Sequence, residues 1–260
     1  AEKTIEKCLD SILDMDYPLY ELIVVNDGST DETGQRLKKY GARVIVMTHS
    51  ASIGPGGSRN EAAALAKGDY LAFTDADCFV ANSWVKELMK GFNEASVVSV
   101  GGIQEIPEDE TDFGRKVSRF LRKAGFISDY MRRREKGICP VPHNASCCVI
   151  YKKDIFLKEG GFLTELWPGE DVELDYRLIK KGYRIHCNPA AIVMHYRPDN
   201  LLSFIRMMSR YGFAQGFLVR KYGIFRKTQL IPFVFLAFLF FCAGLTFLNP
   251  LYLFVFLGAC

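Results

Sequence analysis

Two aspartates separated by a single residue, Asp75 and Asp77, follow the apolar run 70–74. In an extended chain this spacing presents carboxylate oxygens to a hard divalent cation, Mg²⁺ or Mn²⁺, which can also bind a diphosphate. An Asp-x-Asp sequence taken alone also suits a solvated turn, which would need no ligand. Its position directly after a predicted strand favours a cation site that serves a nucleotide substrate.

A second acidic pair, Glu170 and Asp171, follows Trp167-Pro168-Gly169 and begins a predicted helix over 171–181, which ends at Gly182. At a helix N-terminus the dipole favours negative charge, so we expect Asp171 to be ionised. An ionised carboxylate can act as a general base and take a proton from a hydroxyl group. The alternative is that the two acids only cap the helix.

These acids need a fold that brings strand ends together. Strand-like and helical patterns alternate up to residue 74, and we predict elements at 22–26, 31–39, 43–47, 55–67 and 70–74. This order is typical of a largely parallel sheet with crossover helices. Further strands are predicted at 97–100, 147–151, 183–187 and 190–194. Because ligands bind beyond the carboxyl ends of such strands, Asp27 and Asp75 should face one crevice.

Four motifs then occur in order, and together they carry a resemblance. They are Val24-Val25-Asn26-Asp27-Gly28-Ser29-Thr30-Asp31, then Gly57-Ser58-Arg59-Asn60 leading to Gly68-Asp69-Tyr70-Leu71-Ala72-Phe73-Thr74-Asp75-Ala76-Asp77, then Gly160-Gly161-Phe162, and Gly169-Glu170-Asp171. From Thr4 to His195 the chain resembles the family 2 glycosyltransferases with the GT-A fold. The resemblance implies an α/β, Rossmann-like mixed sheet and an inverting transferase. It also implies a nucleotide-sugar donor and a divalent metal, Mg²⁺ or Mn²⁺.

The resemblance implies roles for residues on the donor side. Asp27 would bind the base of the nucleotide, Asp75 the ribose and Asp77 the metal. Arg59 would lie near the nucleotide. His195 ends the predicted strand 190–194, and in the family a late histidine reaches the metal or the diphosphate; a strand-end histidine bonded to solvent or backbone is the alternative.

On the acceptor side, Asp171 would be the catalytic base, with Asn144 and Glu170 beside the acceptor. Such a base takes the proton of the acceptor hydroxyl as its oxygen attacks the anomeric carbon. No Gln-x-x-Arg-Trp sequence follows Glu170-Asp171, which favours addition of one sugar over processive synthesis. The family's first strand is also missing, because the sequence opens in a predicted helix at Ala1, and we expect a longer N-terminus.

The C-terminal segment has a different composition. All 63 charged residues precede Gln229, and the last 32 residues carry none. We predict a catalytic domain over 1–198, an amphipathic interfacial helix or linker over 199–228, and transmembrane segments within 229–260, with more chain beyond. The nearly unbroken apolar run 230–248 has about the length that spans a bilayer. Lys and Arg just before it place the catalytic domain in the cytoplasm by the positive-inside rule.

These patterns also exclude some function classes. The net charge of +3 is too small to indicate nucleic-acid binding. Eight cysteines could indicate disulfides or zinc, but no Cys-x-x-Cys pair occurs and two of the cysteines lie in the apolar C-terminal segment, so a reducing compartment is the simpler interpretation. The sequence therefore predicts a membrane-anchored glycosyltransferase that moves one sugar to a lipid-linked or membrane-proximal acceptor. The alternative is a catalytically inactive membrane subunit that only binds a sugar nucleotide.

Overall fold

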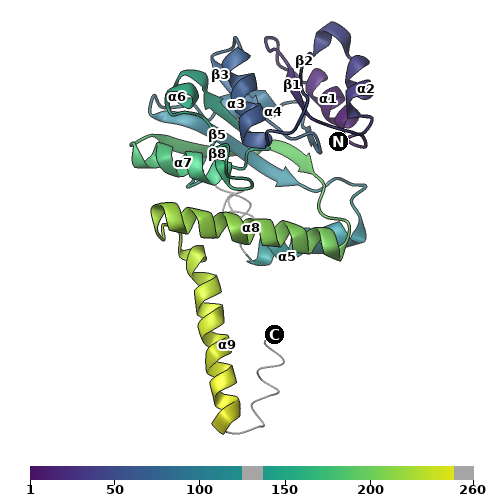
Figure 1. Cartoon of the computed structure of the whole chain (residues 1–260). Helices are drawn as coiled ribbons and strands as arrows, with labels where there is room; N and C mark the ends of the chain where they lie inside the picture. Colours follow the sequence, from purple (N-terminus) through teal and green to yellow (C-terminus); the bar gives the residue numbers. More distant parts are fainter. Residues whose placement is uncertain (125–136, 249–260) are drawn as a thin grey trace. The chain divides into compact units, whose positions relative to one another are not determined.

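A computed structural model describes residues 1–124 and 137–248 of the chain. The chain divides into two compact units, Ala1–Tyr211 and Gly212–Cys260. Every predicted site residue belongs to the first unit. This unit contains the strands and most of the helices (Figure 1).

The first unit begins with a small parallel pair of strands. β1 (Ile23–Asp27) pairs with β2 (Ile45–His49), and α1 (Ile5–Leu13) and α2 (Thr33–Lys38) lie beside them (Figure 1). The buried side chains that join these elements are Ile5, Leu9, Leu37, Tyr40 and Val44. The chain therefore does open in a helix, as the sequence predicts.

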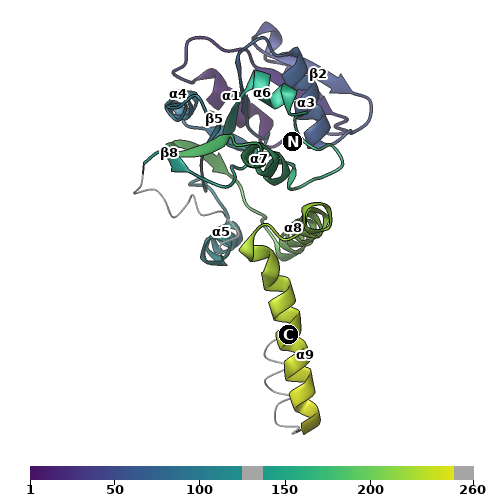
Figure 2. The same ribbon diagram turned by 90° about the vertical axis from the view of Figure 1, so that its left-hand side faces the viewer.

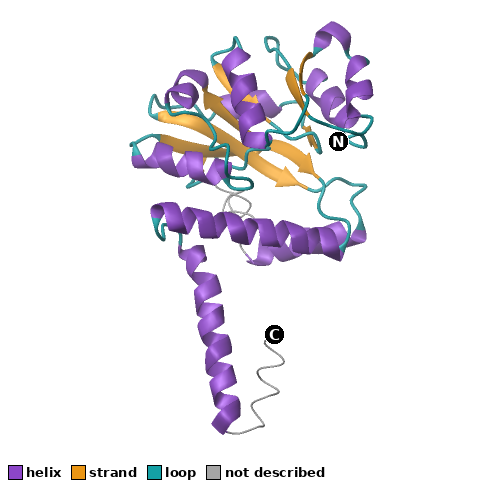
Figure 3. Cartoon of the chain, in the orientation of Figure 1, coloured by secondary structure: helices purple, strands orange, loops and turns teal. Residues whose placement is uncertain are grey.

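A second sheet has six strands in the order β3-β7-β5-β8-β4, with β6 paired to β8 (Figure 3). The strands are β3 (Tyr70–Phe73), β4 (Cys78–Val80), β5 (Val97–Glu105), β6 (Cys139–Pro140), β7 (Val149–Lys152) and β8 (Arg184–His195). Only the β5–β8 pairing is parallel among them. The mixed sheet expected from the resemblance is confirmed, whereas the largely parallel sheet predicted from element order is wrong.

Helices cover both faces of the larger sheet. Val149 and Tyr151 of β7 pack in one core with side chains of α3 (Pro55–Leu65), α6 (Lys153–Lys158) and α7 (Glu170–Lys180). Ile150, between them, packs in the other core with α1 and α4 (Trp84–Met89). Successive side chains of a strand point to opposite faces, which explains this division. Figure 2 shows α1 and α4 on one side and α6, α3 and α7 on the other.

Strand β8 shows where a local sequence signal was misleading. We predict two strands, 183–187 and 190–194, with Asn188-Pro189 between them. The structure has one continuous strand, whose pairing with β5 shifts register between Cys187 and Ile192. A bulge accommodates a proline that cannot donate a hydrogen bond to the sheet. The continuous strand carries His195 to the same sheet edge as β4.

The remaining helices are α5 (Asp112–Ala124), α8 (Leu201–Tyr222) and α9 (Ile231–Leu248). Helix α8 occupies much of the predicted helical linker 199–228, and α9 lies in the second unit. In the described part of the chain, no helix combines the length and the hydropathy needed to cross a bilayer. The predicted transmembrane segment is thus unsupported, and the part of it over 249–260 lies outside the described residues.

Candidate active site

The carboxylate of Asp27, at the end of β1, is fully engaged by neighbouring donors. Its two oxygens accept hydrogen bonds from the backbone N–H groups of Ile53 and Gly54, each at 2.9 Å, and from Ser52 Oγ at 2.6 Å. His49 Nδ1 lies 2.8 Å from Oδ1. Burial alone would raise the pKa of Asp27, but these hydrogen bonds hold it well below its usual value. Asp27 therefore fixes the loop that enters α3.

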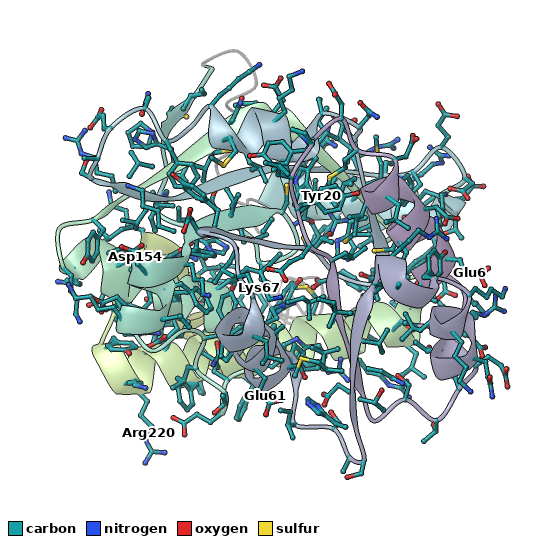
Figure 4. All side chains as sticks on the ribbon, turned by 90° about the horizontal axis from the view of Figure 1, so that it is seen from above. Glu6, Tyr20, Glu61, Lys67, Asp154 and Arg220 are labelled. Atoms are coloured by element: carbon teal, nitrogen blue, oxygen red, sulfur yellow. The ribbon has the colours of Figure 1, made fainter. Side chains whose placement is uncertain are left out.

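His49 occupies the register position opposite Asp27 on β2. Its Nε2 lies 2.8 Å from a carboxylate oxygen of Glu61, which Figure 4 labels on α3. Hydrogen bonds to Asp27 and then to Glu61 raise the pKa of His49 above its usual value. His49 is not among the predicted site residues, and its register position opposite Asp27 explains why it lies here.

Arg59, in the second turn of α3, joins the two acidic motifs. Its guanidinium donates to Asp75 Oδ1 at 2.5 Å and to Glu170 Oε1 at 2.6 Å. The arginine side chain is 14% exposed, and the Glu170 side chain is 3% exposed. A planar guanidinium suits two carboxylates at once because its donors form a rigid fork. The structure thus brings together residues that lie 111 positions apart in the sequence.

The surroundings of Glu170 favour its neutral form despite this ion pair. Burial, followed by the nearby charge of Asp171, raises the pKa of Glu170 to about 7, against the lowering effect of Arg59. Removing a carboxylate from water penalises its ionised form. Glu170 is therefore a buried partner of Arg59 in this structure, and its predicted place beside an acceptor stays a prediction.

Asp171 is held at the start of α7 by two backbone donors. Its Oδ2 accepts from the N–H of Ser146 at 3.0 Å, and its Oδ1 from the N–H of Val172 at 2.7 Å. Gly169, which has a φ of 105°, turns the chain into the helix. The side chain of Asp171 is half-buried, unlike that of Glu170 beside it. An oriented, accessible carboxylate at a helix N-terminus can accept a proton.

Asp77 and His195 meet at the edge of the larger sheet, where Cys78 of β4 pairs with His195 of β8. His195 Nε2 lies 3.5 Å from Asp77 Oδ2, and the Asp77 side chain is 54% exposed. Burial would raise the pKa of Asp77, yet the histidine beside it lowers that pKa below its usual value. For His195, burial lowers the pKa, but Asp77 outweighs this effect and leaves the pKa raised.

The side chains of Asp77 and His195, with Asp75 nearby, fit a divalent cation. Oxygens of Asp75 and Asp77 lie within 4.8 Å of each other, together with the sulfur of Cys78. Mn²⁺ accepts both carboxylate oxygen and imidazole nitrogen, so Asp77 and His195 are suitable ligands. Asp75 is already bound to Arg59 through one oxygen, which leaves its other oxygen for a ligand.

Asn144 lies behind the site rather than inside it. Its side chain is 1% exposed and donates to the backbone carbonyl of His186 at 2.9 Å. Its own N–H donates to Asp175 Oδ2 at 2.7 Å. The amide group packs over Gly101, where even a Cβ would come within 2.2 Å of it. The buried side chain of Asn144 therefore holds neighbouring backbone in place, and this geometry does not expose it to an acceptor.

Two polar contacts were missed by the sequence reasoning. Asn60 of α3 exchanges hydrogen bonds of 2.8 Å with both the N–H and the carbonyl of Phe162, which fixes the Gly160–Phe162 loop. Asp175 is fully buried and accepts from the Tyr151 hydroxyl at 3.0 Å. Asp175 lies one helical turn after Asp171, so i, i+4 spacing on α7 was the available signal. Asn60 lies within a recognised motif, but its partner could not be read from the sequence.

A separate surface hollow lies at the other end of β3. It is lined by residues at the start of β3 and the end of β7, including Lys67 and Asp154, which Figure 4 labels. Asp75 follows the opposite end of that strand. The hollow therefore does not include the acidic residues described above. Those residues, rather than the hollow, form the candidate active site.

The arrangement comprises an Asp-x-Asp pair at a strand end, an acidic helix start and an arginine linking them. Residues 1–160 match the family model "Glycosyl transferase family 2". The chain belongs to this family. It is thus a glycosyltransferase, as the sequence predicts.

Named relatives differ in how much of their length this family 2 glycosyltransferase spans. It is 27% identical over 247 residues to a dolichyl N-acetyl-alpha-D-glucosaminyl phosphate 3-beta-D-2,3-diacetamido-2,3-dideoxy-beta-D-glucuronosyltransferase of Methanococcus voltae, covering 90% of this chain and 75% of that protein. It is 29% identical to the pre-mycofactocin glycosyltransferase of Mycobacterium tuberculosis, over 74% of this chain and 40% of the relative. A poly-beta-1,6-N-acetyl-D-glucosamine synthase of Staphylococcus aureus is 25% identical over 91% of this chain, which spans 57% of that synthase.

Solved structures agree on the fold. The mannosyltransferase PcManGT from Pyrobaculum calidifontis, in complex with GDP-Man and Mn²⁺, superposes with a TM-score of 0.65 at 20% identity. That match covers 85% of this chain and 61% of the other. S. aureus TarS 1–349 with UDP-GlcNAc gives a TM-score of 0.60 at 19% identity, over 84% of this chain and 63% of TarS. The GT-A fold implied by the four motifs is confirmed.

Proposed function

We propose that this enzyme transfers one sugar, with inversion, from a nucleotide-sugar donor to a lipid-linked or membrane-proximal acceptor. The observation that carries the proposal is the bridge through Arg59. It places Asp75, on the predicted donor side, next to Glu170 and the start of α7, where Asp171 lies. Donor and acceptor groups must lie within reacting distance, and a rigid link between their binding elements serves that requirement.

The donor is expected at the Asp75–Asp77 turn. Two structural neighbours were solved with GDP-Man and UDP-GlcNAc, and these names support a nucleotide-sugar donor for the present enzyme. Asp75 would bind the ribose through the oxygen that Arg59 leaves available. Asp27 would contact the base, in addition to holding residues 52–54.

Asp77 and His195 would hold Mn²⁺ or Mg²⁺, and the PcManGT complex with Mn²⁺ supports this assignment. The cation would supply charge neutralisation for the departing diphosphate. The chain itself contributes the exposed carboxylate of Asp77, which is oriented by its neighbour His195. The lowered pKa of Asp77 favours the ionised carboxylate, which is the form that binds a cation.

Asp171 would be the base on the acceptor side. The N–H groups of Ser146 and Val172 orient its carboxylate, which accepts the proton of the acceptor hydroxyl as that oxygen bonds to the anomeric carbon. The bond between the anomeric carbon and the diphosphate oxygen breaks in the same step. Attack from the side opposite to the leaving group gives inversion.

The acceptor is proposed to be presented at a membrane, with the catalytic unit in the cytoplasm. The Methanococcus relative's name specifies a dolichyl-linked sugar phosphate, which supports a lipid-linked acceptor. Helix α9 has no charged residue, and its Val234, Phe240 and Phe241 side chains are 64–75% exposed. Such a surface is unfavourable in water, and we propose that lipid covers it. Arg220, Lys221, Arg226 and Lys227 precede it and suit anionic headgroups.

The test is release of nucleoside diphosphate from a panel of sugar nucleotides by the full chain, with lipid-linked acceptors, with and without Mn²⁺. We expect acceptor-dependent release that needs the cation. Donor binding without any release across the panel would instead favour the inactive binding subunit. Flotation of the full chain with anionic vesicles, compared with a chain ending at Lys227, tests the membrane proposal separately.

A further inference from the structure

Two cysteines and His195 form a cluster beside the Asp75–Asp77 turn. The sulfurs of Cys78 and Cys147 and a ring nitrogen of His195 all lie within 4.8 Å of one another. Cys78 begins β4, Cys147 comes two residues before β7, and His195 ends β8. Both cysteines are buried, at 1% and 4% exposed, whereas the imidazole is partly open to solvent. Three distant segments of the chain therefore converge on one small volume with one open side.

The orientation of the imidazole is set by its second nitrogen. His195 Nδ1 lies 3.3 Å from Gln104 Oε1 and 3.3 Å from a guanidinium nitrogen of Arg197. A histidine that binds a metal through Nε2 typically donates its Nδ1–H to an oxygen, and Gln104 Oε1 supplies that acceptor, whereas the Arg197 guanidinium has only donors. Nε2 faces the Asp77 side, so Nε2 is the ligand atom the geometry offers.

We propose that Cys78, Cys147 and His195 form a binding site for a thiophilic divalent cation, with Zn²⁺ as the prime candidate. Two sulfurs and one imidazole are a common zinc ligand set, and water or Asp77 would complete a tetrahedron. Tetrahedral zinc with Zn–S bonds of ~2.3 Å separates its ligand atoms by about 3.5–3.8 Å. The three ligand atoms, all within 4.8 Å of one another, lie close to this spacing. On binding, each S–H bond breaks, a sulfur–metal bond forms, and the thiol proton passes to solvent.

This site differs in chemistry from the one proposed for the donor cation. Mn²⁺ and Mg²⁺ favour the carboxylate oxygens of Asp75 and Asp77, whereas thiolates select softer ions. The two sites share His195. A zinc ion held by the cysteines would therefore withdraw that imidazole from the donor cation. Zinc binding itself does not depend on the proposed transferase reaction.

Absorption spectroscopy of the full chain with Co²⁺ tests the site without any activity measurement. The reduced protein should show sulfur-to-cobalt charge-transfer absorption and the intense visible bands of tetrahedral cobalt, both abolished by excess Zn²⁺. Cys78→Ser and Cys147→Ser should each remove the charge-transfer band or weaken it at least several-fold. Cys139→Ser, which changes a cysteine outside the cluster, should keep it. Circular dichroism of each variant, with Cys→Ala versions as a second set, controls for misfolding.

Other results would overturn the proposal. Cobalt bands of an octahedral, oxygen-ligated ion that both serine variants retain would show that only the aspartates bind metal. The untreated protein could have two fewer free thiols than the reduced protein. If either serine substitution removes this difference, Cys78 and Cys147 form a disulfide instead. If the bands appear as expected but the protein freed of cobalt and zinc and supplied with Mn²⁺ turns over no sugar nucleotide, the zinc site stands and the proposed function fails.

Discussion

Asp27 and Asp77 each lie at or just beyond the end of a strand, yet their surroundings are opposite. Asp27 is surrounded by four hydrogen-bonding groups, including two backbone N–H groups of the loop over 52–54. Asp77 is more than half exposed, and its neighbour across the strand pair is His195 at 3.5 Å. The first carboxylate is part of the fold, whereas the second remains available to a ligand.

The same contrast separates the two acids at the start of α7. Glu170 is buried against Arg59, and Asp171 is half-buried with an oriented carboxylate. Residues of one chemical type at adjacent positions therefore divide into a structural member and a reactive member. Each class predicts a different result on substitution: loss of stability for the first and loss of turnover for the second.

The largest expected effect is on turnover in Asp171→Asn. The amide keeps the shape and the hydrogen bond from Ser146 but cannot take a proton, so the transfer rate should fall by ~10²–10⁴-fold. Donor affinity and the midpoint of urea unfolding should stay close to those of the unsubstituted enzyme. Initial rates of nucleoside diphosphate release, with donor titrations, measure both. A variant that keeps more than half of the rate would exclude Asp171 as the base.

A large loss of stability is expected for Asp27→Ala. The substitution removes the acceptor for Ser52 and for two backbone N–H groups, and hydrogen bonds to a charged group contribute about 1.5–3 kcal/mol. We expect the free energy of unfolding to fall by about 2–3 kcal/mol in urea titrations. Unchanged stability with weakened donor binding would instead show that Asp27 serves only the nucleotide.

Local elements were predictable because their signals are local. Apolar runs and turn residues placed β1, α3, β3 and α7 within about two residues of their observed bounds. Strand pairing was predicted less well, because the order β3-β7-β5-β8-β4 depends on contacts between residues far apart in the chain. The alternation of strands and helices suggested parallel neighbours, but β7 lies between β3 and β5 and is antiparallel to both.

The site shows the same limit. Two of the motifs do meet, because Arg59 contacts both Asp75 and Glu170. That Arg59 joins Asp75 to Glu170 depends on how α3 packs near α7, and no spacing in the sequence reports it. Asn144 was placed beside an acceptor by resemblance, whereas the close approach of Gly101 lets its amide lie in the core. The Cys78–Cys147–His195 cluster likewise appears only once β4, β7 and β8 are aligned.

An effect of similar size, confined to the pH dependence of stability, is expected from Glu170→Gln. Folding raises the pKa of Glu170 from 4.5 to about 7. Below pH ~4.5 Glu170 is protonated in both the folded and the unfolded state, so its full contribution to the free energy of unfolding is present. As pH rises to about 7, the folded state holds a proton that the unfolded state releases, and stability falls by an amount on the order of 2–3 kcal/mol. Glutamine cannot titrate, so urea unfolding midpoints between pH 4.5 and 7 should decline less steeply in the variant. Parallel slopes for the two proteins would contradict the raised pKa.

The smallest effect on stability is expected for Asp77→Ala, which is the direct counterpart of Asp27→Ala. The exposed carboxylate has only His195 as a charged neighbour within salt-bridge distance among the described residues, and substitutions at such positions change stability by about 0.5 kcal/mol or less. Donor binding should nevertheless lose its dependence on Mn²⁺, because the cation would have lost its main carboxylate ligand. Calorimetry with a sugar nucleotide, with Mn²⁺ and then with a chelator, measures this. If Asp77→Ala destabilises the protein as much as Asp27→Ala does, while metal dependence persists, then both carboxylates are structural and the cation binds elsewhere.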